Sequence, residues 1–337
     1  MNAQLLEKFF AQFRNKKVMG FFGALVAFII ILYLIAWADM KPSLLVETGL
    51  IAMTPLALAA VGECINEKAG TINIGLEGIL GITCVIGVWG AELFGSGVMG
   101  LLVGFIAGAF IGFIFAIISV YGRADQMVAG MGINLLALGL VAYLLMSIWG
   151  FPGIYVFSNK LVVSPIHTPW GSLHPVTIIA IAAAILAQIF LYKTLFGLRI
   201  RAAGEKPEAV DVAGVSVARI RIIASTFGAA LCGLGGAFLA LGWFGAIVKE
   251  ISAGRGFIAL ACVVFAGAEP LVALGAAFIF GFTDGLASWI AITPGVKNVI
   301  PVYFINMIPY IATIVIVTVA IGRRGFPRAA GKPYLRE

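Results

Sequence analysis

Long apolar runs alternate with short polar segments along the whole chain. A helix needs about 20 apolar residues to cross the hydrocarbon core of a bilayer. Runs near this length predict ten spans, at about residues 18–38, 44–62, 78–94, 98–120, 127–149, 176–196, 222–244, 257–266, 271–290 and 302–321. The pattern therefore predicts an all-α fold, that of a polytopic membrane protein with about ten transmembrane helices.

Three regions follow from this pattern. A cytoplasmic N-terminal arm, residues 1–17, precedes a single transmembrane domain, residues 18–322, and a basic cytoplasmic tail, residues 323–337, ends the chain. The least defined boundary is the segment 267–270, between the eighth and ninth spans. It is either a turn between two helices or a kink in one long run, because spanning helices tolerate proline.

Composition supports a membrane protein and excludes three other classes. Hydrophobic residues make up 62% of the 337 residues and charged residues only 11%, against about 25% in ordinary soluble domains. A polar surface cannot enclose so much apolar material in a chain of this size. The composition therefore excludes a soluble globular enzyme, a disordered chain and a nucleic-acid-binding protein.

The basic residues predict the side of the membrane that each loop occupies. With the N-terminus in the cytoplasm and alternating spans, 17 of the 22 Lys and Arg residues fall on cytoplasmic segments. The other five are Lys41, Lys160, Lys249, Arg255 and Lys297. This asymmetry follows the positive-inside rule, favours an even number of spans and places both termini in the cytoplasm.

Few side chains offer catalytic or metal-binding chemistry. The four cysteines lie in or beside apolar runs without a CxxC spacing, and the two histidines share one loop without a third ligand. The cysteines are Cys64, Cys84, Cys232 and Cys262, and the histidines are His167 and His174. We predict small buried thiols, loop histidines, no catalytic residue and no metal site.

Two stretches of the chain resemble each other weakly. Residues 77–85 and 255–263 share Gly, Cys and Val at matching positions, and they open the third and eighth spans. An odd number of spans separates them, so they have opposite orientations, as an inverted repeat requires; chance similarity is the alternative. A pseudo-inverted repeat predicts that the starts of these two spans approach the bilayer midplane from opposite sides and meet there.

The charged segment 197–221 predicts a short helix between two spans. Pro207 suits the first turn of a helix, and Glu208 and Asp211 favour its N-terminal half through the helix dipole. Gly214 suits its C-terminal end. The expected helix covers about residues 207–213, either as an ordinary cytoplasmic turn of helix or as a helix that docks into a groove of another protein.

This segment resembles the cytoplasmic coupling loop of ABC importer permeases of the branched-chain amino acid and simple-sugar superfamily. It is most similar to the nucleoside and simple-sugar group, whose loop typically reads GENPEAA. Lys206 stands where that family usually has Asn, so the usual helix-capping acceptor is missing. Four further stretches agree, in order, across about residues 60–337: EKAGTINIGLEG at 67–78, INLLALGL at 133–140, GRGFIALA at 254–261 and GKPY at 331–334.

The resemblance implies a membrane-spanning permease subunit of an ATP-binding cassette importer in a bacterial cytoplasmic (inner) membrane, and not an enzyme. It implies separate ABC ATPase subunits that carry ATP and Mg, because this chain has no P-loop; no cofactor is expected on the chain itself. It also implies a second permease subunit, a related but different chain, and an extracytoplasmic substrate-binding lipoprotein.

An uncharged solute fits the scarcity of fixed charges within the spans, with nucleosides first and simple sugars or riboflavin-like ligands as alternatives. Two other classes are an ion-coupled secondary transporter and a membrane enzyme acting on lipid or isoprenoid. The transporter would need paired buried carboxylates, for which Asp284 is a single candidate. The enzyme would need a cluster of acids, His or Cys, which the sequence lacks.

Two sets of site residues follow. The resemblance assigns ATPase coupling to Arg199, Gly204, Glu205, Pro207, Glu208, Asp211 and Gly214. The repeat and the intramembrane polar groups assign the substrate path to Asn73, Glu77, Asn134 and Phe257. Amide and carboxylate groups hydrogen-bond ribose hydroxyls, and an aromatic ring stacks on a base.

Three of the four path residues also have a structural alternative. Glu77 is otherwise a carboxylate stabilised by the dipole of its own helix, and Asn134 an interhelical hydrogen-bonding group. Phe257 otherwise packs against lipid or a neighbouring helix. Of the remaining charges near the spans, Arg255 is expected to be an interfacial anchor and Asp284 to have a structural role.

Overall fold

The structure is a computed structural model that describes residues 42–150, 153–168, 171–292, 307, 327–332 and 334. Its helices are α3 (Pro42–Lys68), α4 (Leu76–Phe94), α5 (Gly97–Val120), α6 (Gln126–Trp149), α7 (Pro175–Lys193), α8 (Leu195–Glu205), α9 (Pro207–Val212), α10 (Val217–Phe238), α11 (Arg255–Ala266) and α12 (Pro270–Ile292). A π-helical stretch, η2 (Leu239–Phe244), extends α10. The short elements between helices are β1 (Tyr155–Val156), η1 (Asn159–Leu161), β2 (Ile166–Thr168), β3 (Gly171–Leu173) and β4 (Ala246–Ile247).

Seven predicted spans are confirmed as helices. Within the described residues, α3, α4, α5, α6, α7, α10 and α12 are long and apolar enough to cross a membrane. The eighth predicted run forms α11, which has only 12 residues. The first and last predicted spans, residues 18–38 and 302–321, lie outside the described residues. The chain is therefore a mainly helical, multi-pass protein, and the count of ten spans stays a prediction.

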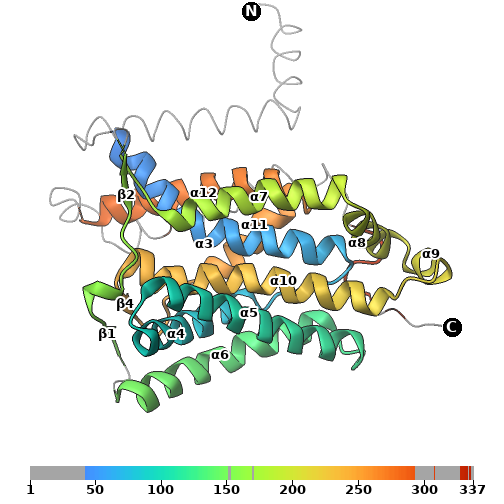
Figure 1. Ribbon diagram of the computed structural model, residues 1–337, viewed down its shortest axis with the longest axis horizontal. Helices are drawn as coiled ribbons and strands as arrows, with labels where there is room; N and C mark the ends of the chain where they lie inside the picture. The colour runs from blue at the N-terminus through green and yellow to red at the C-terminus, as the bar shows by residue number, and fades with distance from the viewer. Residues whose placement is uncertain are drawn as a thin grey trace, which may run out of the picture.

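The helices form a bundle with α3 and α10 near its centre (Figure 1). α10 packs on α3, α4 and α5, and α3 packs in turn on α7, α11 and α12. Most of α3, α4 and α10 is buried, whereas most of α5, α6 and α7 faces outward. Their outward side chains include large apolar ones such as Phe110, Leu135 and Leu186, as a surface facing lipid requires.

Glycines bring the central helices into close contact. A Cβ atom on Gly228 of α10 would lie 2.5 Å from the Gly62 carbonyl oxygen of α3. A Cβ atom on Gly233 would lie 2.4 Å from the Gly104 carbonyl oxygen of α5. Both separations are shorter than a van der Waals contact, so these backbones approach each other only because neither α10 residue has a side chain.

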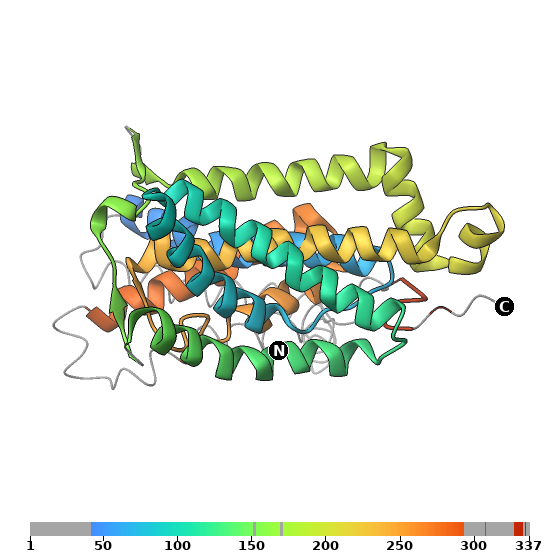
Figure 2. The ribbon, with the colours of Figure 1, turned by 60° about the horizontal axis from the view of Figure 1, so that its bottom comes forward.

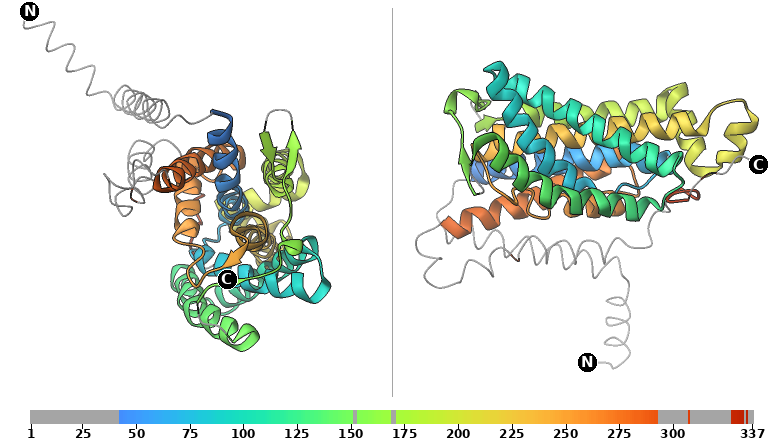
Figure 3. Two further views of the ribbon diagram at one scale, coloured as in Figure 1. Left: turned by 90° about the vertical axis from the view of Figure 1, so that its left-hand side faces the viewer. Right: turned by 90° about the horizontal axis from the view of Figure 1, so that it is seen from below.

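The two ends of the bundle differ. α8 and α9 project at one end, and the strands lie at the other (Figures 1 and 2). β1 pairs with β4 and β2 with β3, both antiparallel, and the end-on view shows the β2–β3 hairpin on the rim of the bundle (Figure 3). Arg123 and Arg221, both predicted to be cytoplasmic, line one pocket at the α8–α9 end. Lys160 and Lys249, predicted on the opposite side, lie in η1 and beside β4.

The structure defines two helix boundaries that the sequence left wrong or open: the end of α3 and the turn between α11 and α12. The sequence predicts that the second span ends near residue 62, which is wrong, because α3 continues through the polar residues that follow to Lys68. Glu63 and Glu67 lie in its last turns and are each only 2% exposed, since neighbouring helices cover them. The segment 267–270 is a turn between separate helices: Gly267, with a φ of 60°, ends α11, and α12 follows.

Candidate functional site

The chain turns back into the bundle between α3 and α4. Residues 71–75 are not helical, and α4 begins only at Leu76. The Cys232 Sγ lies 3.6 Å from the Leu76 carbonyl oxygen, and Cys232 is near the middle of α10 and its π-helical extension. The start of α4 therefore lies inside the bundle, far from both ends. All four cysteines are buried free thiols, as predicted.

Buried polar side chains pair the backbone of this non-helical segment. Glu63 Oε1 accepts a hydrogen bond from the Asn73 N–H at 2.7 Å, and Gln126 Oε1 accepts one from the Ile72 N–H at 2.8 Å. Asn73 Oδ1 accepts a third from the Gly75 N–H at 2.8 Å. Backbone groups at membrane depth need partners within the protein, so these side chains stabilise the break between helices.

Asn134 of α6 holds the first turn of α4. Its Oδ1 accepts a hydrogen bond from the Gly78 N–H at 2.8 Å, and its Nδ2 donates one to the Ile74 carbonyl oxygen at 3.0 Å. The side chain is 8% exposed. The structure thus confirms the interhelical hydrogen bond, and a contact of Asn134 with substrate stays a prediction.

Replacing Asn134 with Leu should destabilise this junction. The apolar side chain leaves the Ile74 carbonyl and the Gly78 N–H without partners, at a cost of about 1–3 kcal/mol for each buried group. We expect a lower thermal unfolding temperature of the purified protein in detergent. The control is Asn159→Leu, the same change at an exposed residue of η1. Equal unfolding temperatures for the two variants would contradict the assignment.

Glu77 joins the start of α4 to the start of α11. Its Oε1 accepts a hydrogen bond from the Gly254 N–H and its Oε2 one from the Gly256 N–H, both at 2.7 Å. A Cβ atom on Gly256 would lie 2.3 Å from the Glu77 nitrogen, so the two backbones are in direct contact. The structural alternative predicted for Glu77 is stabilisation by the dipole of its own helix. The structure shows that the carboxylate also caps the N-terminus of α11.

Arg255 corrects a prediction. It was expected to anchor the chain at the membrane interface, but its side chain is buried and its Nη2 lies 2.9 Å from Asp284 Oδ2. Its guanidinium also stacks over the Trp243 ring, 4.6 Å from the centroid. The prediction is wrong because α11 begins inside the bundle, where a cation needs a counter-charge. Asp284 supplies that charge, which is the structural role expected of it.

The predicted path residues thus fall into two groups. Asn73, Glu77 and Asn134 are brought together around the start of α4, where each binds backbone groups. Phe257 lies two residues beyond Arg255 on α11 and is 46% exposed, so its ring reaches the outer surface of this chain. The structure places the two helix starts in contact; the inverted repeat itself and the role of these four residues in transport stay predictions.

The helix predicted at 207–213 is present as α9. Pro207 and Val210 are buried against the rest of the protein, while Val212 is 90% exposed at its tip. Lys206 provides no side-chain cap, as its chemistry predicts. Gly214, with a φ of 78°, follows the helix, and its N–H donates a hydrogen bond to the Asp211 carbonyl oxygen at 2.9 Å.

The remaining predicted coupling residues surround this helix. Arg199 and Glu205 are exposed on α8, and Glu208 is exposed on α9. Gly204 is buried where α8 meets the end of α3: a Cβ atom there would lie 2.3 Å from the Lys68 carbonyl oxygen. The end of α8 therefore packs directly on the turn that leads to the non-helical residues 71–75.

An ion-paired cluster fixes three helices at the same end. Glu269, which precedes α12, accepts hydrogen bonds from Tyr192 of α7 and from Lys68 Nζ of α3, the latter at 2.9 Å. Burial alone would raise the pKa of Glu269, but the hydrogen bonds from Tyr192 and Lys68 outweigh it and lower that pKa. The carboxylate therefore stabilises the fold at neutral pH, and this contribution is lost as the pH falls through the lowered pKa.

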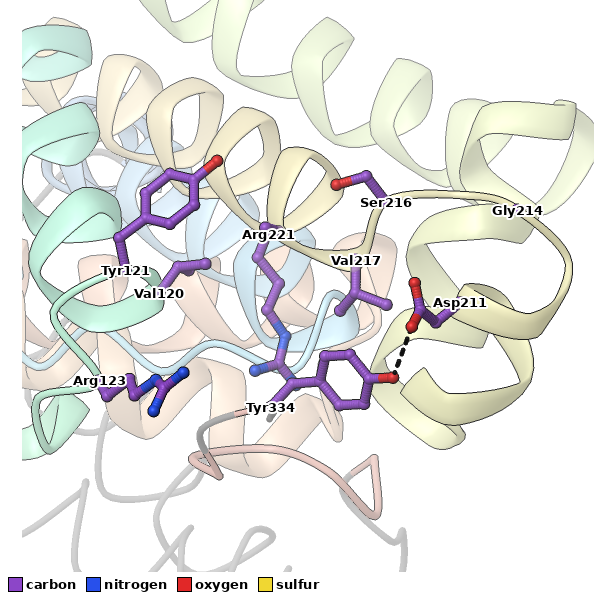
Figure 4. A pocket seen from close by; sticks show the side chains of 10 residues that line it. Val120, Tyr121, Arg123, Asp211, Gly214, Ser216, Val217, Arg221 and Tyr334 are labelled. Carbon is purple, nitrogen blue, oxygen red and sulfur yellow. Dashed lines mark hydrogen bonds between the residues drawn. The ribbon is translucent and has the colours of Figure 1, made fainter. Parts of the chain in front are cut away.

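A pocket of about 390 Å³ opens beside α9 (Figure 4). It is lined by residues from α5, α9, α10 and the tail: Val120, Tyr121, Arg123, Asp211, Gly214, Ser216, Val217, Ala218, Arg221 and Tyr334. Within the described residues, no three His, Cys, Asp or Glu side chains gather in a metal-binding arrangement. The geometry thus offers a buried junction of helix starts and, at one end of the bundle, the projecting helices α8 and α9 with a pocket beside them.

Comparison with known proteins decides the family. A family described as branched-chain amino acid transport system / permease component matches residues 45–322. The chain belongs to this permease family. The match runs from α3 through α12 and includes the α8–α9 segment, so the protein is the permease of an ABC importer.

Several similar proteins are named as permeases of ABC transporters. It is 35% identical over 315 residues to the guanosine ABC transporter permease NupQ of Bacillus subtilis, and the alignment covers 87% of this chain and 97% of NupQ. It is 34% identical over 310 residues to the nucleoside ABC transporter permease NupC of Lactococcus lactis, with the same coverage. The putative glucose ABC transporter permease TsgC13 of Haloferax volcanii is 30% identical over 318 residues, and the alignment covers 85% of this chain and 95% of TsgC13. No solved structure matches.

Proposed function

We propose that this permease imports nucleosides across a bacterial cytoplasmic membrane. The observation that carries the proposal is the 35% and 34% identity to NupQ and NupC, against 30% for the putative glucose permease TsgC13 at nearly equal coverage. A nucleoside is uncharged, and the described bundle interior presents amide groups and ion-paired charges at the junction of helix starts. Simple sugars are the alternative, since a glucose permease also matches.

The energy for import is proposed to come from separate ATPase subunits that dock on α9. The chain has no P-loop: the nearest stretch, 325–332, has a spacing one residue too long and is followed by Pro333. α9 packs back on the permease through Pro207 and Val210 and presents Val212 outward, which suits a helix inserted in a partner's groove. ATP and Mg belong to that partner.

The substrate path is proposed to run beside the junction of α4 and α11. Phe257 is exposed at the start of α11, at the depth where Glu77 contacts that helix, so its ring is available to a neighbouring subunit. A second permease, related to this chain but different from it, would complete the path there. An aromatic ring at that position can stack on a base, which is worth about 1–3 kcal/mol. An external lipoprotein would deliver the solute.

Competition for uptake tests the substrate class. Cells expressing the permease with its neighbouring transporter genes should accumulate tritiated guanosine. Unlabelled nucleosides should compete with this uptake, and glucose and riboflavin should not. Uptake that glucose inhibits and nucleosides leave unchanged would assign the permease to sugars instead.

Cysteine labelling tests the proposed orientation. Lys160 lies at the strand end of the bundle and Lys332 at the α8–α9 end, so Lys160→Cys and Lys332→Cys should react from opposite sides of the membrane. With a membrane-impermeant maleimide on intact cells, we expect labelling at 160 only, and labelling at 332 only after lysis. Labelling of both positions in intact cells would contradict a cytoplasmic α9 and a cytoplasmic C-terminal tail.

A further inference from the structure

The described tail residues, 327–332 and 334, connect the coupling segment to the turn after α3. The Ala329 N–H donates a hydrogen bond to the Gly204 carbonyl oxygen at 2.9 Å, at the end of α8. The Gly331 N–H donates one to the Gly70 carbonyl oxygen at 3.2 Å, in the turn that precedes residues 71–75. The tail therefore lies between the end of α8 and the turn after α3, and is hydrogen-bonded to both.

Arg221 of α10 fastens the tail to the same turn. Its Nη1 donates to the Lys332 carbonyl oxygen at 2.8 Å, and its Nε donates to the Ala69 carbonyl oxygen at 3.3 Å. The side chain is only 2% exposed, and its Nη2 has no hydrogen-bond partner among the described residues. Burial of a cation is costly unless its donors are hydrogen-bonded, so the two carbonyls hold the guanidinium against both the tail and the turn.

Tyr334 extends the connection to α9. Its Oη donates a hydrogen bond to Asp211 Oδ2 at 3.2 Å, and Figure 4 shows the ring reaching past Arg221 toward this carboxylate. Asp211 lies in α9, the helix on which an ATPase is proposed to dock. The tail thus contacts the coupling helix, the end of α8 and the turn after α3.

The turn after α3 leads directly to the buried junction. Residues 71–75 follow it, and Glu77 then binds the start of α11 through the Gly254 and Gly256 N–H groups. The hydrogen bonds of the tail and the backbone of residues 71–77 therefore connect α9 to the place where α4 and α11 meet. Backbone hydrogen bonds along a short segment allow little independent movement of the residues that they join.

We propose that the tail, fixed by Arg221, transmits the movement of α9 to the start of α4 during transport. Arg221 and Tyr334 are positioning residues in this scheme, and the proposal rests on ATPase docking at α9. The guanidinium fork is needed because a single group must reach carbonyls on two segments, which a lysine ammonium on its flexible stem does not hold in fixed geometry.

The test is the number of ATP molecules hydrolysed per nucleoside imported, measured in proteoliposomes containing the complete transporter. The variants are Arg221→Lys and Tyr334→Phe. The matched controls are Arg219→Lys, an exposed arginine on the same helix, and Tyr121→Phe, an exposed tyrosine across the pocket. We expect the ratio to rise about fivefold or more in Arg221→Lys, to rise in Tyr334→Phe, and to stay at the wild-type value in both controls.

A structural role alone would lower the amount of assembled transporter without changing this ratio. The proposal is overturned by a wild-type ratio in both variants at equal assembly. It is also overturned if Arg221→Lys fails to assemble while Tyr334→Phe keeps the wild-type ratio. The wild-type complex is measured before any variant. Absence of substrate-stimulated ATP hydrolysis in that complex would refute the proposed function instead of the role of the tail.

Discussion

Glu77→Gln is expected to lower uptake at least about tenfold while the chain still inserts into the membrane. The carboxylate accepts two N–H groups from the start of α11, and charged hydrogen bonds of this kind contribute about 1.5–3 kcal/mol each. Gln keeps one acceptor oxygen but turns an amide N–H₂ toward a backbone donor. The loss of even one bond corresponds to a factor of about ten in the equilibrium constant for the contact between the starts of α4 and α11.

The measurement is initial uptake of guanosine at equal membrane expression. Glu250→Gln is the matched control, because Glu250 is an exposed carboxylate in the segment that precedes Gly254. Its uptake should equal that of the wild type. Wild-type uptake in Glu77→Gln would show that the joined helix starts are not required for transport.

Val212→Asp is expected to abolish stimulation of the ATPase without unfolding the permease. Val212 is 90% exposed at the tip of α9, so the substitution removes almost no internal contact. A carboxylate forced into an apolar groove without a partner charge costs several kcal/mol, which is enough to prevent docking. ATP hydrolysis by the reconstituted complex should fall to the rate of the free ATPase, and the thermal unfolding temperature of the permease should not change.

Val212→Thr is the control for this substitution. It keeps the branched shape and adds no charge, so hydrolysis should remain close to the wild-type rate. Normal stimulation in Val212→Asp would move the docking site away from α9.

The features that the sequence predicted well depend on local signals. Span positions follow from apolar length, which is the property that a bilayer demands, and seven helices agree. α9 was predicted because Pro207 and Gly214 mark its two ends within eight residues of each other. Recognition of the family rested on motifs that are contiguous in the chain.

The features that were missed depend on contacts between distant segments. Glu63 and Gln126 were not among the predicted site residues, although both bind the backbone of residues 71–75. Their polarity beside apolar runs was visible, but their partners were not. The Glu77 carboxylate binds N–H groups 177 and 179 residues away, and Arg255 pairs with a residue on another helix. Nothing in local hydropathy encodes such pairings.

ATP-dependent uptake by the purified transporter tests the central claim most directly. The permease is reconstituted with its ATPase, second permease and binding protein, and tritiated guanosine is supplied on the strand side of the bundle. With no ion gradient, we predict uptake only when hydrolysable ATP is present on the α9 side, and none with a non-hydrolysable analogue. Guanosine uptake driven by a proton or sodium gradient in the absence of ATP would contradict the account.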